Sequence, residues 1–213
     1  MKRLLVVLFL LFTVNMLSAK EPVKIGDKVD LSVLNDPDKV IHATIGGVSD
    51  DAKKKYKTFD EYIAARRRDS VTGKGFEVFF ALDFNAKNDK QKLIPTAALG
   101  NPHDPTDLVL TDVRTGTVTR LIQCKIGQNA TIDAANDPKY FGSDILVPSD
   151  TFDKIKDEYD RKKYFVKFMY FTKEPMPDNI VQDVNGFSTK DKKKYEERSI
   201  KYLKSEYLKQ NEK

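Results

Sequence analysis

Three polar residues near the middle of the chain have side chains whose types and spacing suit chemistry on a phosphate. Asp107 precedes an alternating apolar run that ends at Val113, and Gln123 and Lys125 belong to a second such run over residues 117–125. A carboxylate and an amide oxygen hold hard divalent cations, while an ammonium group stabilises an incoming hydroxide or the charge that develops on phosphorus. These three residues are therefore the first candidates for a reactive centre.

The two runs are predicted to form a β-hairpin. Residues 114–116, Arg-Thr-Gly, separate them. The last residue of a three-residue hairpin loop favours the left-handed backbone region, which Gly116 reaches at little cost. Val113 then pairs with Thr117, and this pairing sets the register of both strands.

This register brings the three polar residues to one face of the sheet. Asp107 falls opposite Gln123, and because side chains alternate between the two faces of a strand, Lys125 shares their face. The other face is apolar and is expected to face the core. Its members are Leu108, Leu110, Ile122, Cys124 and Ile126.

In these residues the chain resembles the PD-(D/E)xK nuclease superfamily, the restriction-endonuclease-like enzymes. In that family an Asp at the start of one strand and a Glu-x-Lys on the next form the site, and Pro105-Thr106-Asp107 with Gln123-Cys124-Lys125 match this pattern. Gln123 is a known variant of a position that usually carries Glu or Asp. The resemblance implies that Asp107 and Gln123 bind Mg²⁺ or Mn²⁺ and that Lys125 assists the attacking hydroxide.

The resemblance covers roughly residues 70 to 160 and includes a helix over residues 72–87, on which such families often carry a glutamate. Glu77 is the candidate, both as a catalytic residue and as a third metal ligand. Four phenylalanines make this segment apolar over most of its circumference, so it should be buried. A buried carboxylate needs a partner, so Glu77 points either toward the metal site or toward an Arg or Lys at the helix start.

The first nineteen residues have the features of a secretory signal peptide. Lys2 and Arg3 precede an apolar run over residues 4–17, and Ser18-Ala19 supplies the small residues of a cleavage site. The run is too short and too terminal to favour a stable membrane span. We expect cleavage after Ala19, export through the Sec pathway to the periplasm or the medium, and no stable membrane span afterwards.

The remaining residues, 20–213, are predicted to form a single globular nuclease-like domain. Its fold class is α/β (α+β), with a mixed central β-sheet flanked by helices. The restriction-endonuclease-like core is expected over about residues 70–172, and a charged helix over about residues 188–213. That last helix either packs on the domain through one apolar stripe or contacts nucleic acid or a membrane surface.

Several further elements follow from local patterns. Residues 29–34 and 40–45 suggest small strands. Thr58-Phe-Asp-Glu61 is a capping box that opens a helix through about Arg68. Residues 92–99 are a candidate early core strand. A helix is expected from Ser149 or Asp150 to about Lys162, and a strand over residues 164–171.

The charge of the chain is unevenly distributed. The chain has a net charge of +5, and the loss of Lys2 and Arg3 on cleavage would leave 35 basic and 32 acidic residues, a net charge of +3, which is a weak signal by itself. Residues 53–75, however, contain a basic patch that could meet a polyanion. Its members are Lys53, Lys54, Lys55, Lys57, Arg66, Arg67, Arg68 and Lys74.

Cys124, the only cysteine, is expected to be a buried hydrophobe, and His42 and His103 to be surface residues.

Three functions remain open at this point. The first is an exported metal-dependent nuclease that cuts DNA or RNA. The second is a catalytically inactive, nuclease-like module that binds nucleic acid or a protein partner or inhibitor, because the amide of Gln123 weakens metal binding. The third is an exported envelope or interaction protein without a role on nucleic acid.

Overall fold

The structure is a computed structural model of the chain, and it describes residues 21–66, 68–140, 142–162 and 189–209. The predicted signal peptide at residues 1–19 and the strand predicted over residues 164–171 lie outside the described residues. Within these ranges, no helix combines the length and the apolar character that a membrane crossing requires.

One mixed sheet of four strands organises the fold, with the strands adjacent in chain order. Its strands are β1 (Gln91–Pro95), β2 (Leu108–Asp112), β3 (Val118–Cys124) and β4 (Asp144–Leu146). The first three pair antiparallel, and β4 joins β3 in parallel. The parallel step contains α5 (Gln128–Asn136) and the short 3-10 helix η3 (Pro138–Tyr140), as a parallel connection requires a crossover. The predicted fold class is confirmed.

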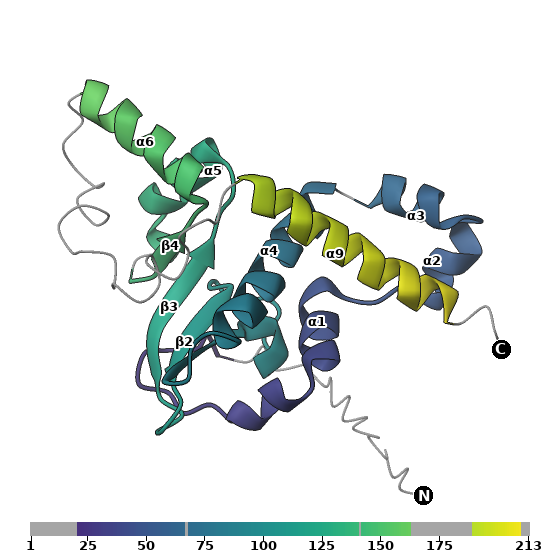
Figure 1. Cartoon of the computed structure of the whole chain (residues 1–213), viewed down its shortest axis with the longest axis horizontal. Helices are drawn as coiled ribbons and strands as arrows, with labels where there is room; N and C mark the ends of the chain where they lie inside the picture. The colour runs from purple at the N-terminus through teal and green to yellow at the C-terminus, as the bar shows by residue number, and fades with distance from the viewer. Residues whose placement is uncertain (1–20, 67, 141, 163–188, 210–213) are drawn as a thin grey trace, which may run out of the picture.

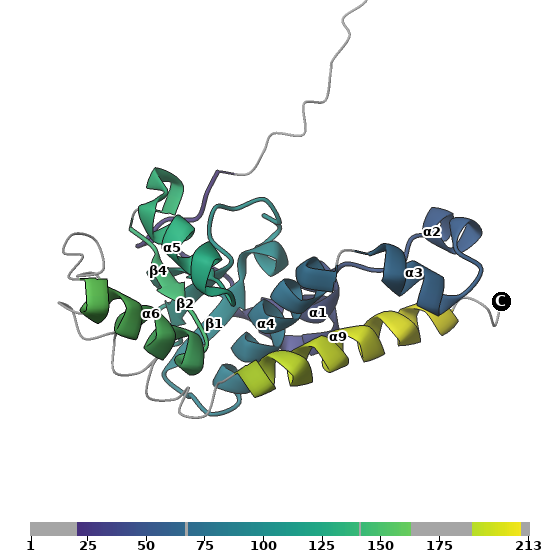
Figure 2. The same cartoon turned by 90° about the horizontal axis from the view of Figure 1, so that it is seen from above.

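The other helices lie around this sheet. They are the 3-10 helices η1 (Leu31–Asn35) and η2 (Thr96–Leu99) and the α-helices α1 (Pro37–Ile45), α2 (Asp50–Lys55), α3 (Phe59–Ala65), α4 (Arg68–Asn85), α6 (Ser149–Lys162) and α9 (Thr189–Leu208). Helix α4 lies against the sheet with α1 and α9 beside it, whereas α5 and α6 lie near β4 (Figure 1). Figure 2 shows α9 extending along the molecule toward α2 and α3.

The hairpin has the predicted register at its open end. Leu108 pairs with Ile122, which places Asp107 opposite Gln123. The predicted apolar face is also confirmed, because its residues belong to the main buried cluster together with the phenylalanines of α4. The strand predicted within residues 92–99 is present as β1, and η2 follows it.

The turn itself differs from the prediction. Asp112, not Val113, pairs with Thr117, because the Asp112 amide donates to the Thr117 carbonyl at 3.0 Å. Gly116 does adopt a positive φ of 66°. A bulge at Thr119 then inserts one residue into β3 and cancels the shift that the longer loop introduced.

The two strands predicted over residues 29–34 and 40–45 are wrong. Both segments are largely helical, as η1 and α1, and only an isolated bridge between Lys28 and Thr117 lies nearby. Pro37 lies in the first turn of α1, where its missing N–H costs nothing. Asp36 caps that helix by accepting a hydrogen bond from the Lys39 amide at 3.2 Å.

The capping box is confirmed, but the helix that it opens is shorter than predicted. The Thr58 hydroxyl accepts from the Glu61 amide at 3.2 Å, and the Glu61 carboxylate accepts from the Thr58 amide at 3.3 Å. Helix α3 ends at Ala65 because Arg66 is extended. The guanidinium of Arg66 donates to the Ile45 carbonyl at 2.7 Å, and this bond ties the end of α3 to α1.

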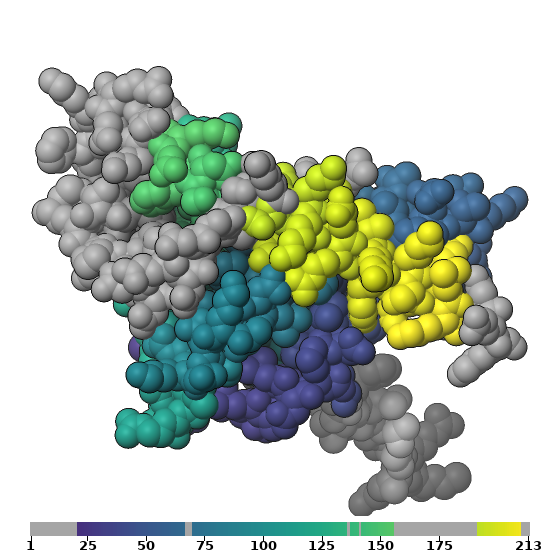
Figure 3. All heavy atoms as spheres, in the orientation of Figure 1, coloured from purple at the N-terminus to yellow at the C-terminus, as the bar shows by residue number. Residues whose placement is uncertain are grey.

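Helix α4 is buried between the sheet and α9. Its buried apolar residues are Val71, Phe76, Val78, Phe79, Phe80, Ala81 and Phe84. The buried stripe of α9 has residues four positions apart, namely Tyr195, Ser199, Leu203 and Tyr207. Tyr195 stacks on Phe76 and Phe79 of α4, whereas Tyr207, at the other end, contacts Phe59 and Tyr62 of α3. In Figure 3 the yellow atoms of α9 lie next to the teal atoms of the α4 region on one face of the molecule, in agreement with the contacts between the two helices. Of the alternatives for the last helix, packing on the domain through one stripe therefore agrees with the structure.

The two helices approach most closely at Gly75. A Cβ atom there would lie 2.1 Å from the Ser199 hydroxyl oxygen and 2.8 Å from the Tyr195 carbonyl oxygen. About two turns further along α4, Asp83 accepts hydrogen bonds from Arg198 at 3.0 Å and from the Tyr195 hydroxyl at 3.1 Å. A small residue and one charged cluster thus hold α9 in place.

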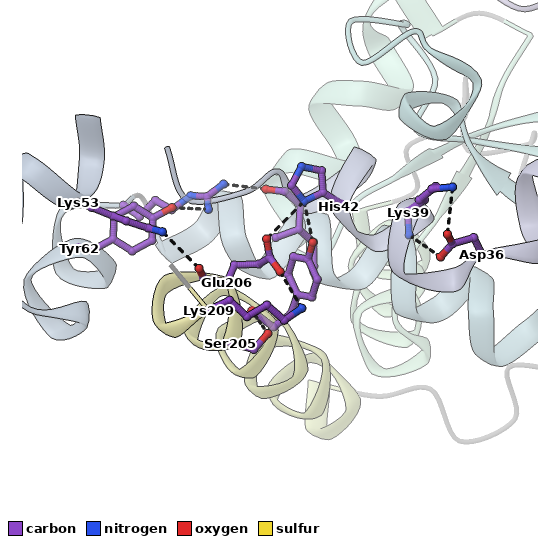
Figure 4. Close-up of polar contacts among 11 residues, drawn as sticks. Asp36, Lys39, His42, Lys53, Tyr62, Ser205, Glu206 and Lys209 are labelled. Carbon is purple, nitrogen blue, oxygen red and sulfur yellow. Dashed lines mark hydrogen bonds and ion pairs between the residues drawn. The ribbon is translucent and has the colours of Figure 1, made fainter. Parts of the chain in front are cut away.

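Polar contacts also join α9 to α1 and α2 (Figure 4). The ring nitrogen Nδ1 of His42 lies 2.8 Å from the Tyr202 hydroxyl and 3.9 Å from a carboxylate oxygen of Glu206. Lys53 donates to the Glu206 carbonyl at 3.5 Å. His42 is exposed, as predicted, but it is bound to its neighbours on α9.

Gly75→Ala should destabilise the protein by about 1–3 kcal/mol, because the new methyl group overlaps backbone atoms of α9 that cannot move freely. Gly73→Ala is the matched control: nothing lies within 4 Å of a Cβ at Gly73, so this change should be neutral or stabilise by up to about 1 kcal/mol. Urea unfolding followed by circular dichroism measures both. Equal effects at the two glycines would contradict the close approach of α4 and α9.

Candidate active site

Asp107 and Gln123 meet where β2 begins and β3 ends. Asp107 immediately precedes β2, and Gln123 is the next-to-last residue of β3. The side-chain amide of Gln123 donates a hydrogen bond to Asp107 Oδ2, and the backbone amide of Cys124 donates to the same oxygen at 2.9 Å. The structure therefore brings these two predicted site residues into direct contact.

The backbone around Asp107 is firmly held. Its amide donates to the Ile122 carbonyl and its carbonyl accepts from the Thr96 amide, each at 3.0 Å. In the loop before it, Asp104 accepts from the amide and the hydroxyl of Thr106 at 2.9 and 2.6 Å. These bonds determine the direction in which the Asp107 side chain leaves the chain.

Glu77 reaches the same place from α4. Lys74, one turn earlier on that helix, donates to Glu77 Oε2 at 2.8 Å and lies 3.9 Å from Asp107 Oδ1. The side chain of Glu77 is 8% exposed and that of Asp107 15%, so both carboxylates are largely removed from water. Glu77 thus lies beside Asp107, one of the predicted site residues, and it also pairs with a lysine of its own helix, which lies inside α4 and not at its start.

Lys125 lies at the border of this cluster. Its ammonium is 5.2 Å from the centre of the Tyr140 ring, over which Lys139 also lies at 5.3 Å. Lys125 acts on Glu77 and Asp107 through its charge, and in both cases Lys74 acts more strongly. The lysine in contact with the carboxylates is therefore Lys74.

The electrostatics of the cluster follow from burial. Desolvation raises the pKa of Glu77 to about 8, and the neighbouring charge of Asp107 adds to this effect. Desolvation also raises the pKa of Asp107. Burial by itself would lower the pKa of Lys74, but the attraction of both carboxylates outweighs it and the pKa is raised. At neutral pH the two carboxyl groups therefore retain a proton.

Cys124 lies beside the site but does not take part as a nucleophile. The cysteine is buried and free, as predicted. Burial raises the pKa of its thiol well above the usual value, so the reactive thiolate is disfavoured. Its backbone amide, which binds Asp107, is the part that contributes to the site.

The candidate metal ligands are two carboxylates and one amide, from Glu77, Asp107 and Gln123. In the described part of the chain, no three or more His, Cys, Asp or Glu side chains are grouped so that they could hold a metal ion. Oxygen ligands suit hard cations such as Mg²⁺ and Mn²⁺, and two ionised carboxylates balance a divalent charge. The donor chemistry thus fits the implied cation, with one neutral ligand.

The described members of the basic patch over residues 53–75 do not all face solvent freely. Arg66 is used in bonds to the Ile45 carbonyl and the Tyr62 hydroxyl, and Lys74 is part of the carboxylate cluster. Exposed basic side chains are found at Lys54, Lys55 and Lys57. The side chains of Arg67 and Arg68 lie outside the described residues.

Lys74 was not among the predicted site residues. The available signal was its position three residues before Glu77, which puts both side chains on one face of a helix. Such spacing also describes exposed ion pairs, for example Lys54 with Asp51. The contact with Asp107 and the burial of Glu77 distinguish Lys74 from them.

Comparison of the chain with protein-family models, with curated proteins and with solved structures found no match. The relation to the PD-(D/E)xK superfamily is therefore a proposal that rests on the site residues described above.

In the presence of a chelator, the free energy of unfolding should fall as the pH rises from about 5 to about 8. Glu77 loses its proton near pH 4.5 in the unfolded chain and near pH 8 in the folded one, so the folded state binds more protons within this window. Glu77→Gln should flatten this dependence and stabilise the protein above pH 8, by an amount on the order of a few kcal/mol. Urea unfolding at several pH values measures it.

Glu197→Gln, at an exposed position of α9, is the matched control and should leave the pH dependence of the wild type unchanged. Parallel curves for the wild type and Glu77→Gln would show that Glu77 does not carry the proton.

Proposed function

We propose that this protein is an exported metal-dependent nuclease that hydrolyses phosphodiester bonds of DNA or RNA. The observation that supports this proposal is the meeting of Glu77, Asp107 and Gln123 from three separate elements, with Lys125 at the border of the cluster. Export is part of the proposal and rests on the sequence of residues 1–19.

Each residue has a role in this proposal. The cation, Mg²⁺ or Mn²⁺, would be held by Glu77, Asp107 and Gln123. When bound, it would activate a water molecule and neutralise charge on the phosphate. Lys125 stabilises the incoming hydroxide and the negative charge that develops on phosphorus. The buried position of the carboxylates strengthens all of these interactions, because water screens them poorly there.

A neutral residue at position 123 is compatible with nuclease activity, because the other two ligands can balance the charge of the cation. Glu77 and Asp107 together provide two negative charges once the proton that they retain is lost. A third carboxylate would add a charge that the divalent cation does not balance, in a place where burial already opposes ionisation. Gln123 contributes an oxygen without this cost.

The second candidate is a nuclease-like module that binds nucleic acid, or a protein partner, without cutting. One observation favours it: the amide nitrogen of Gln123, not its oxygen, is directed at Asp107. In this orientation Gln123 acts as a donor that stabilises Asp107 and does not present a ligand beside it. Exposed lysines at Lys54, Lys55 and Lys57 then provide contacts to phosphates.

Purified residues 20–213 should cut plasmid, single-stranded DNA or RNA in Mg²⁺ or Mn²⁺, and a chelator should stop the cutting. Lys125→Ala should lower the rate by at least about 100-fold, because it removes the charge that stabilises the transition state. Lys139→Ala is the matched control, since Lys139 lies over the same Tyr140 ring and should be dispensable. Single-turnover cleavage with gel analysis measures both variants.

Gln123→Glu tests whether the side chain of Gln123 is a ligand of the cation. If the oxygen of Gln123 binds the cation, the added charge should preserve cleavage and lower the cation concentration needed for half-maximal rate. Loss of cleavage in this variant, with an unchanged fold, would show that Gln123 serves as a donor to Asp107.

Two outcomes would replace the nuclease proposal. Binding of nucleic acid with steep salt dependence, but without cleavage in any cation, favours the binding module. Absence of both binding and cleavage leaves the exported interaction protein.

A further inference from the structure

Lys74 places a positive charge beside both carboxylates. Its ammonium is 2.8 Å from Glu77 Oε2 and 3.9 Å from Asp107 Oδ1. A divalent cation bound by Glu77 and Asp107 would use the same carboxylate groups. Two positive charges repel strongly at such distances in a poorly screened site, so the ammonium and the cation exclude each other.

The side chain of Lys74 borders on solvent. It is 37% exposed, whereas the side chain of Glu77 is 8% exposed, so the lysine side chain is more accessible to water than the carboxylate. The backbone at this point is held in place, because Gly75 is packed against the backbone of Tyr195. An exchange at the site would therefore involve side-chain rotation only.

We propose that Lys74 is an internal competitor of the divalent cation: its ammonium binds Glu77 and Asp107 while the cation is away and swings toward solvent when the cation binds. This inference rests on the proposed function, since it assumes a cation at Glu77 and Asp107. Lys74 thereby stabilises two buried carboxylates without metal and sets the cation concentration that the site requires. The released ammonium stays tethered one helical turn from Glu77.

A purely structural ion pair makes the opposite prediction. If Lys74 only anchors Glu77, its removal disorders the carboxylates and weakens cation binding. If Lys74 competes with the cation, its removal strengthens cation binding. The sign of the change in Mn²⁺ affinity therefore separates the two roles without any measurement of cleavage.

The test is the binding of Mn²⁺ alone, measured from the electron paramagnetic resonance signal of the free ion. Lys74→Met should bind Mn²⁺ at least about tenfold more tightly than the wild type, because it removes a like charge from beside the ligands. Lys74→Arg keeps the charge and should show no such gain. Lys87→Met, at an exposed lysine at the other end of α4, should stay within about twofold of the wild type, since water screens a distant charge.

Each outcome has a definite meaning. Equal or weaker binding by Lys74→Met, with Mn²⁺ bound by the wild type, overturns the role of Lys74 and leaves the nuclease proposal standing. Absence of Mn²⁺ binding by every variant overturns both. If Lys74→Met is unfolded in chelator, the Mn²⁺ concentration that restores its near-ultraviolet circular dichroism is measured instead. Recovery below the wild-type binding midpoint supports the competition, and recovery only above it, or no recovery at all, overturns it.

Discussion

The burial of α4 between the sheet and α9 is the constraint on which the rest of the structure depends. Its phenylalanines fill the main core, and Gly75 lets the backbone of α9 approach closely. A helix packed on both sides cannot rotate to bring a polar residue to the surface. Glu77 therefore remains buried and must find its partners inside the fold, which it does at the end of the sheet where Asp107 lies.

Two carboxyl groups buried in one place would carry an excess of negative charge, and the site reduces this excess in two ways. Lys74 supplies one positive charge in direct contact, and a retained proton removes one negative charge. Neither the proton nor the lysine is fixed at the site, because the proton leaves as the pH rises and the side chain of Lys74 is partly exposed to water. A carboxyl pair whose pKa values are raised in this way is a feature found more often at functional sites than elsewhere in a protein.

The hairpin illustrates how far local patterns predict a site. Strand alternation and Gly116 led to a register in which Asp107 faces Gln123, and their side chains do touch. The structure reaches this register in a way that the sequence did not predict. The turn is one residue longer than predicted, and the bulge at Thr119 compensates for the extra residue. A bulge leaves little trace in an alternating sequence, so the correct register depended on two errors of opposite sign. The end of the hairpin at the site was predictable because both strands there carry a strict apolar face.

The sequence by itself determined the elements whose signals are local. These are the capping box at Thr58, the left-handed turn residue Gly116, the buried helix that carries Glu77 and the apolar stripe of the last helix. It did not determine residues 29–45, because a proline that starts a helix and one that breaks a strand look alike without the cap contacts of Asp36. Only the tertiary structure decided that Lys74, not Lys125, contacts the carboxylates. The physical reason is that an i, i+3 pair on a helix is compatible with either solvent or interior, and the packing of α4 against the end of the sheet selects the interior.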